Sequence, residues 1–220
     1  MWRFFGRYLS RSKNPSDTRQ VVSDTISTPL ALRVATTNRG KLGELERLLA
    51  PGIELRLQSP EFEAPEEAGA TYLANALAKA RALAAATAEI ALGEDSGLEV
   101  DALGGGPGMR SARYAPTDAE RVGRLLRELE GVPADRRTAR FRCAIAVVWP
   151  DGREAIAEGR VEGVIVAGPR GGGGFGYDPI FAPAGSGRTF AELSEREKDA
   201  VSHRGDAARA LRRKLDSNGR

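Results

Sequence analysis

The sequence predicts an α/β fold, because segments with the two-residue period of strands alternate with segments with the 3.6-residue period of helices. The expected strands cover residues 30–36, 53–58, 98–103, 140–149 and 153–166, and the expected helices cover residues 41–50, 70–88, 118–129 and a closing stretch after residue 205. The last two strands are joined by Pro150-Asp151-Gly152, a strong hairpin signal. At 220 residues, the chain is long enough to bury a full core.

The composition is that of an ordinary globular protein, with 41% hydrophobic and 29% charged residues. No run approaches the roughly 18 apolar residues that a membrane-spanning helix needs, so no membrane segment is expected. The single cysteine, Cys143, cannot form an intrachain disulfide. This fits a reducing compartment, and a cytoplasmic location is predicted.

Residues 1–28 differ from the rest of the chain. They hold five basic and two acidic residues and therefore carry the whole net charge of +3. Arg3, Arg7 and Arg11 recur among aromatic residues, which fits a disordered or artefactual extension, an organelle-targeting segment, or a membrane-surface or partner-binding segment. The remaining chain is balanced in charge, which is weak support for nucleic-acid binding. We expect one domain over residues 29–216 and a short tail over residues 217–220.

The first expected strand runs into a polar turn, residues 37–40, just before the first expected helix. The helix has leucines on one face and ends before Pro51-Gly52. Backbone N–H groups and the helix dipole favour an anion at such a turn. The segment is therefore either a phosphate site that includes Lys41 or an ordinary strand-to-helix connection.

The second expected helix, residues 70–88, is rich in alanine and carries Asn75 and Lys79 one turn apart on the same face. A lysine on a helix is usually solvated. Apolar neighbours such as Leu73 and Leu77 crowd this helix, which favours an inward position for Lys79, towards a phosphate.

The segment from Leu92 to Tyr114 opens on two carboxylates, Glu94 and Asp95, and we expect a sharp turn at Ser96-Gly97. Like charges held close together raise one another's pKa, and a divalent cation such as magnesium would relieve this. The glycine-rich run at residues 104–108 is expected to let the backbone approach a ligand, with two arginines following it. A hairpin turn with surface acids is the alternative.

A second glycine-rich loop covers residues 169–181. Phe175 and Tyr177 alternate with Gly176 and would offer a flat apolar face to a base, with Asp178 as a polar edge. The alternative is a flexible hairpin whose aromatic side chains fold into the core. Further along, His203 lies next to Arg204, and both side chains are able to donate hydrogen bonds to a carbonyl oxygen.

Four motifs follow one another along the chain: ATTNRGK at residues 35–41, ExGxT with NAxxKA at 67–80, EDSGLxVD with SARY at 94–114, and GGFGYDP with SHRG at 173–205. Together they resemble the inosine triphosphate pyrophosphatase family, whose members hydrolyse noncanonical purine nucleoside triphosphates. The resemblance covers Leu32 to about Leu211. It implies an α/β fold with a long central mixed β-sheet and flanking helices, two lobes around an active-site cleft, and a homodimer. It also implies a magnesium-dependent reaction that yields the monophosphate and pyrophosphate.

The resemblance implies substrate-binding roles for Thr36, Thr37, Asn38, Arg39, Gly40, Lys41, Lys79, Ser96, Phe175, Gly176, Tyr177, Asp178, Lys198, His203 and Arg204. It places Glu67 and Asp95 at the metal, and Asp95 is the expected catalytic residue that orients or deprotonates the attacking water. Phe175 would stack on the purine. Lys198, His203 and Arg204 would bind near the base and recognise its 6-oxo group.

Three positions depart from the family pattern. Thr37 stands where the phosphate loop usually has glycine, Glu94 replaces the first aspartate of an Asp-Asp pair, and Ala74 replaces a glutamate. The first change bears on phosphate affinity. The second lengthens one acidic side chain and leaves the role of Glu94 open.

Three alternative functions remain at this point. The first is a nucleotide-binding sensor with little turnover, against which the retained Glu67 and Asp95 argue. The second is a pyrophosphatase for another modified nucleotide. The third is an RNA-binding protein that uses the basic residues 1–28 and the glycine-aromatic loop at 169–181, against which the neutral remainder of the chain argues. The prediction is an enzyme whose partner is a small-molecule substrate rather than a nucleic acid or a membrane.

Overall fold

The computed structural model describes residues 29–217, so the N-terminal segment 1–28 and most of the predicted tail lie outside the described residues. The strands are β1 (Leu30–Val34), β2 (Ile53–Leu57), β3 (Ala91–Val100), β4 (Gly106–Gly108), β5 (Thr138–Val148), β6 (Glu154–Ile165) and β7 (Phe181–Pro183). The helices are α1 (Arg39–Leu49), α2 (Tyr72–Thr87), α3 (Asp118–Glu128), α4 (Glu195–Val201) and α5 (His203–Ser217). None of the helices within residues 29–217 is long and apolar enough to span a membrane.

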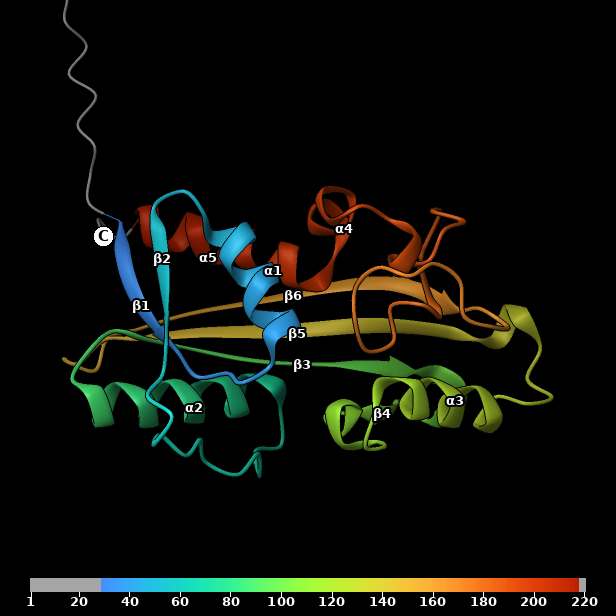
Figure 1. The fold of residues 1–220 in the computed structure, drawn as a ribbon, viewed down its shortest axis with the longest axis horizontal. Helices are drawn as coiled ribbons and strands as arrows, with labels where there is room; N and C mark the ends of the chain where they lie inside the picture. The colour runs from blue at the N-terminus through green and yellow to red at the C-terminus, as the bar shows by residue number, and fades with distance from the viewer. Residues whose placement is uncertain (1–28, 218–220) are drawn as a thin grey trace, which may run out of the picture.

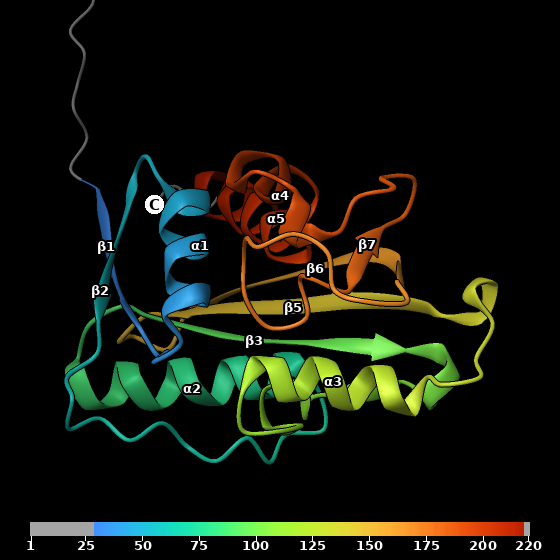
Figure 2. The same ribbon diagram turned by 45° about the vertical axis from the view of Figure 1, so that its right-hand side comes forward.

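The described strands form one seven-stranded mixed sheet in the order β2-β1-β3-β5-β6-β7, with β4 paired to β3. β1 runs parallel to both β2 and β3, whereas β3, β5, β6 and β7 pair antiparallel. Helices α2 and α3 lie on one side of the long strands, and α1, α4 and α5 lie on the other (Figure 1, Figure 2). The predicted α/β fold with a long mixed sheet is thus confirmed.

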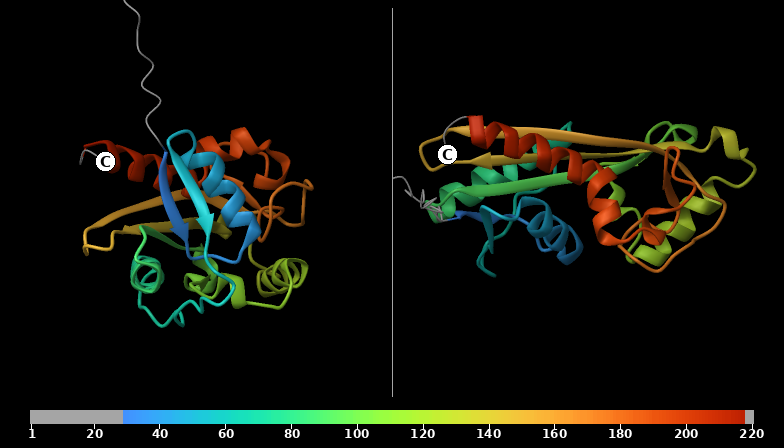
Figure 3. Two further views of the ribbon diagram at one scale, coloured as in Figure 1. Left: turned by 60° about the vertical axis from the view of Figure 1, so that its left-hand side comes forward. Right: turned by 90° about the horizontal axis from the view of Figure 1, so that it is seen from above.

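The buried core forms separate clusters along the length of the sheet, and these define the two expected lobes. Figure 3 shows the long strands extending from one end of the molecule to the other. At one end, Leu45 of α1 and Leu211 of α5 pack on one face of the sheet, and Leu83 of α2 packs on the other. At the other end, Leu125 of α3 packs with Phe181 of β7 in a separate cluster. The long strands β3, β5 and β6 run through both lobes and hold them together.

The predicted turn at Ser96-Gly97 is wrong. β3 continues through both residues, and Ser96 and Gly97 pair with Cys143 and Arg142 of β5 in a regular antiparallel register. Gly97 serves close packing instead of a turn, because a Cβ there would lie 2.3 Å from the carbonyl oxygen of Gly108 in β4. The chain reverses only after Val100, through a short 3-10 helix.

Helix α2 lies very close to β3. Its first turn is capped by Thr71, whose side chain accepts a hydrogen bond from the N–H of Ala74. A Cβ on Gly93 of β3 would lie 2.1 Å from the carbonyl oxygen of Ala76, so only glycine allows this approach. The short distance brings Asn75 and Lys79 of α2 up to the middle of β3.

Candidate active site

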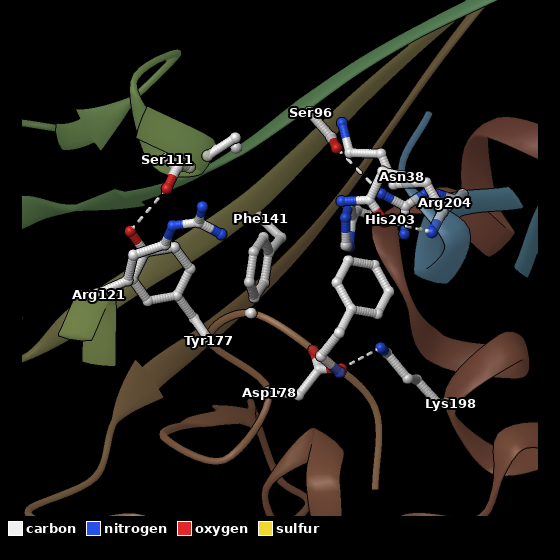
Figure 4. A pocket seen from close by; sticks show the side chains of 15 residues that line it. Asn38, Ser96, Ser111, Arg121, Phe141, Tyr177, Asp178, Lys198, His203 and Arg204 are labelled. Atoms are coloured by element: carbon white, nitrogen blue, oxygen red, sulfur yellow. Dashed lines mark hydrogen bonds and ion pairs between the residues drawn. The ribbon is translucent and has the colours of Figure 1, made fainter. Parts of the chain in front are cut away.

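A pocket between the two lobes gathers most of the predicted substrate-binding residues. Its lining includes Asn38, Lys41, Ser96, Gly97, Ser111, Ala112, Arg121, Phe141, Phe175, Gly176, Tyr177, Asp178, Lys198, His203 and Arg204. Figure 4 shows Tyr177 and Arg121 on one side of Phe141, and His203 and Arg204 on the other. These residues come from α1, β3, β5, α3, α4, α5, the short turn at Ser111 and Ala112 and the glycine-rich loop 169–181, so the pocket exists only in the folded chain.

The amino end of α1 forms one wall of the pocket. Asn38 is the N-cap residue, and its side chain accepts a hydrogen bond from the N–H of Lys41 at 3.0 Å. Thr36, Thr37 and Arg39 line a neighbouring cavity that Asn38 also borders, on the side towards β2. The positive-φ conformation that glycine favours is avoided at Thr37, since Ala88 is the only non-glycine residue with positive φ in the described chain.

The two acidic residues of β3 point to opposite faces of the sheet, because side chains alternate along a strand. Glu94 faces α1 and α5, where Lys41 Nζ lies 2.8 Å from its Oε2. Asp95 faces α2, where Lys79 Nζ lies 3.7 Å from its Oδ1. The expectation that these neighbouring carboxylates repel one another and share a cation is therefore wrong, since each has its own lysine.

Asp95 and Glu67 meet beside Lys79. Lys79 Nζ lies 2.7 Å from Glu67 Oε1, and Arg113 Nη1 lies 2.9 Å from Glu67 Oε2. Burial raises the pKa of Asp95 above its ordinary 3.8, although Lys79 and a hydrogen bond from Asn75 act against this. Burial would also raise the pKa of Glu67, but Lys79 and Arg113 outweigh it and hold that pKa below 4.5.

The carboxylates present fit a magnesium ion. Within residues 29–217 no cluster of three or more histidine, cysteine, aspartate or glutamate side chains is arranged to hold a metal. Glu67 and Asp95 nevertheless face the same ammonium group, so a cation would find two carboxylates there. Magnesium commonly binds through one or two carboxylates, waters and substrate phosphates instead of a closed protein cage.

Glu94 belongs to a buried charge network that includes Glu44, a residue that the sequence analysis missed. Arg204 is 1% exposed and is hydrogen-bonded to Glu44, to Glu94 at 3.0 Å and to Ser96 Oγ at 3.0 Å. Lys198 Nζ lies 2.6 Å from Glu44 Oε1 and also contacts Asp178. The sequence feature that could have indicated burial of Glu44 is its position beside leucines on the apolar face of α1.

Replacing Glu44 by glutamine should destabilise the protein by about 3 kcal/mol at pH 7, because it leaves two buried cations short of a partner. Burial would raise the pKa of Glu44, but Arg204 and Lys198 outweigh it and hold the pKa below 4.5. The ionised form therefore stabilises the fold above that pH, and its contribution is lost as the pH falls through the lowered pKa. Urea denaturation of both proteins between pH 3 and pH 7 should show the difference shrinking below about pH 4.5. A constant difference would contradict the prediction.

The base side of the pocket combines the ring of Phe175, which Lys198 and Arg204 approach, with buried hydrogen-bond donors. Phe175 packs against the amino end of α1, since a Cβ on Gly40 would lie 2.6 Å from its ring. His203 stacks on Phe141 at 4.7 Å between ring centroids, and its Nδ1 has no hydrogen-bond partner among the described residues. Burial first, and then the charge of Arg204, hold the pKa of His203 well below 6.5, so the imidazole is neutral at pH 7.

The loop that carries Phe175 is held by specific hydrogen bonds. Asp178 accepts a hydrogen bond from the N–H of Phe175 at 2.8 Å, and Gly174 must be glycine because a Cβ there would lie 2.0 Å from Asp178 Oδ2. The hydroxyl of Tyr177 donates to the carbonyl of Ser111 at 2.9 Å. Part of the glycine content of this loop therefore serves its own fold.

The first glycine run, residues 104–108, does not line the pocket. Gly104, Gly105 and Gly108 have positive φ and form the tight connection into β4. The expected close approach to a ligand at this run is wrong. Glycine is needed in this run because the backbone there adopts positive φ. In this part of the chain, only the following residues Ser111 and Ala112 reach the pocket.

The model of the Ham1 family matches residues 32–214 of this chain. The chain belongs to the Ham1 family. A relative from Nitratidesulfovibrio vulgaris named dITP/XTP pyrophosphatase is 50% identical over 196 residues, which cover 84% of this chain and 95% of the relative. Another of that name, from Symbiobacterium thermophilum, is 51% identical over 187 residues, covering 84% and 93% of the two chains.

Solved structures of Ham1 proteins share the fold. A Ham1 protein from Coxiella burnetii is 42% identical, has a TM-score of 0.75, and matches over 86% of this chain and 99% of its own. A nucleoside-triphosphatase and dITP/XTP pyrophosphatase from Mycobacterium abscessus is 47% identical with a TM-score of 0.67, over 82% and 98% of the two chains. Membership of the Ham1 family agrees with the resemblance seen in the sequence motifs.

Proposed function

We propose that this chain hydrolyses the noncanonical purine nucleoside triphosphates ITP, dITP and XTP to the monophosphate and pyrophosphate, and so removes them from the nucleotide pool. The observation that carries the proposal is one pocket that joins Phe175 and the buried donors Lys198, His203 and Arg204 to Ser96, the neighbour of Asp95. The Ham1 relatives named dITP/XTP pyrophosphatase support the same substrate class.

Recognition of the base follows from the donors of the pocket. Phe175 supplies the ring on which a purine stacks. Lys198, His203 and Arg204 offer hydrogen bonds to a 6-oxo group, and adenine, with an amino group at that position, would leave them unpaired. Because such unpaired buried groups are costly, the pocket favours hypoxanthine and xanthine over adenine.

The phosphate end uses cations and the amino end of a helix. Thr36, Asn38 and Lys41 surround the amino end of α1, where backbone N–H groups favour phosphate oxygens. Glu67 and Asp95 would hold magnesium, which would neutralise charge on the leaving pyrophosphate. Asp95 accepts a proton from the attacking water or orients it, because its carboxylate lies beside the proposed metal site.

The direct test is a product assay with magnesium on the triphosphates of inosine, xanthosine, adenosine and guanosine. We expect pyrophosphate from the first two, with kcat/KM at least about 100-fold above that for adenosine triphosphate. Orthophosphate as the product would refute the proposed chemistry. Tight binding without turnover would identify a nucleotide sensor.

The proposal includes a homodimer in the cytoplasm, built from a single domain over residues 29–216. The family resemblance supports the dimer, and the single cysteine, Cys143, supports a reducing compartment. Light scattering of the purified chain would test the dimer: a mass of 23.5 kDa, that of one chain, would exclude it.

A further inference from the structure

Asn75 occupies an unusual position for its residue type. It lies in the first half of α2 and is 2% exposed, although asparagine is a poor helix former and α2 is otherwise rich in alanine. The cap of the helix is Thr71, so α2 does not need the side chain of Asn75 to begin. The reason for an asparagine must lie in what its amide contacts.

The amide of Asn75 bridges two separate segments. Its Oδ1 accepts a hydrogen bond from the N–H of Gly69 at 2.8 Å, and its Nδ2 donates to Asp95 Oδ2 at 2.8 Å. A backbone N–H can only donate, so the atom that faces Gly69 is the oxygen and the NH2 group must face Asp95. Nδ2 also lies 3.8 Å from Met109 Sδ, so both hydrogens of the NH2 group have an acceptor.

These bonds hold the carboxylate of Asp95 and the loop that carries Glu67. Asp95 Oδ2 is held by Asn75, and Asp95 Oδ1 accepts from the N–H of Ser96 at 3.0 Å, so the plane of the carboxylate is set. Glu67 lies two residues before Gly69, whose N–H the same amide holds. One buried side chain therefore ties the loop that carries Glu67 to the strand that carries Asp95.

We infer that Asn75 is a positioning residue that sets the separation and orientation of the Glu67 and Asp95 carboxylates for a divalent cation. This inference rests on the proposed function, in which these carboxylates hold magnesium. We assign Asn75 no contact with the substrate, because it is 2% exposed and its amide is held by Gly69 and Asp95. It acts through the two groups that it holds, as partners of metal ligands commonly do.

Two substitutions test the hydrogen bonds of Asn75, one by removing both of them and one by disturbing only the bond to Gly69. Asn75→Leu keeps the volume of the side chain and removes both hydrogen bonds. Gly69→Ala places a Cβ 2.5 Å from Asn75 Oδ1, so it displaces the loop of Glu67 and spares the bond to Asp95. Thr71→Ala is the matched control, because it weakens the same end of α2 through its cap and touches neither carboxylate.

The primary measurement is the titration of each purified protein with Mn²⁺ alone by calorimetry, with thermal melting as the check on folding. We expect Asn75→Leu to weaken Mn²⁺ binding by about 10- to 100-fold, and Gly69→Ala to weaken it by about tenfold. Thr71→Ala should lower only the melting temperature. In the pyrophosphate assay, Asn75→Leu should raise the half-saturating magnesium concentration while KM for inosine triphosphate at saturating magnesium changes by less than about threefold.

Unchanged Mn²⁺ affinity in the folded variants would overturn the inference, as would an equal loss in Thr71→Ala or a wild-type protein that binds no Mn²⁺. If Asn75→Leu does not fold, Gly69→Ala decides the question. A wild-type protein that binds Mn²⁺ but releases no pyrophosphate would refute the proposed function alone, since the titration tests Asn75 without turnover.

Discussion

Asp95→Asn is expected to lower kcat for inosine triphosphate by about 10³-fold while leaving the protein folded. The substitution keeps the size of the side chain but removes the negative charge and the proton acceptor. Asp95 is 3% exposed, and Glu67, the acid on the other side of Lys79, is already paired with Lys79 and Arg113. The measurement is pyrophosphate release at saturating magnesium and substrate.

The fold of Asp95→Asn should survive because two effects on its stability oppose each other. The variant loses a hydrogen bond, since its NH2 group must face either the amide of Asn75 or the N–H of Ser96. It also no longer buries a charge, which offsets that loss. Asp101→Asn, the same change at an exposed position just after β3, is the matched control and should leave kcat unaltered. Near-normal turnover in a folded Asp95→Asn protein would exclude Asp95 as the catalytic residue.

Local chemistry was enough to predict helix α1 and the hairpin between β5 and β6. The leucine spacing of α1 and its cap at Asn38 depend on residues close together in sequence, and the helix begins at Arg39, within two residues of the prediction. The hairpin between β5 and β6 follows from Pro150-Asp151-Gly152, where Gly152 takes a φ of 88°. Capping and turn geometry are decided within a few residues, so sequence alone reveals them.

The course of β3 could not be predicted in the same way. Ser-Gly after two acids has the composition of a turn. The segment stays extended because β5 pairs with it along its whole length and β4 pairs with its last three residues, Leu98 to Val100. Partners about 50 residues away in sequence decide this geometry, and their register also sends Glu94 and Asp95 to opposite faces.

The candidate site also contains residues that the sequence predicted and a residue that only the three-dimensional structure reveals. The motifs indicated Lys41, Lys198 and Arg204 as cations for a nucleotide, and the structure does bring them to one pocket. Glu44, the charge partner of Lys198 and Arg204, was hidden, because a glutamate on a helix is usually solvated and only packing against α4 and α5 buries it. Long-range packing thus determines which charges are neutralised inside the protein.

Arg204→Ala is expected to destabilise the protein by about 3 kcal/mol, because it removes the cation that two buried carboxylates share. Glu44 and Glu94 keep Lys198 and Lys41 as remaining partners, which should prevent complete unfolding. The melting temperature, measured at neutral pH, should fall by several degrees. An unchanged melting temperature would mean that the network contributes nothing to stability.

The same substitution should erode the preference for inosine over adenosine triphosphate by about 10- to 100-fold in kcat/KM. Arg204 has five N–H groups, and its contacts with Glu44, Glu94 and Ser96 engage four of them. The one that remains is held in a fixed direction and is the donor available to a 6-oxo group.

Glu44→Gln is the matched control for this recognition role, since it disturbs the network but keeps the guanidinium. A preference lost only in Arg204→Ala identifies direct recognition of the base. Equal losses in both variants would mean that Arg204 only holds its neighbours in place, and an unchanged ratio would exclude it from base selection. Because the ratio of kcat/KM compares two substrates on one protein, a smaller folded fraction cancels and stability does not confound the result.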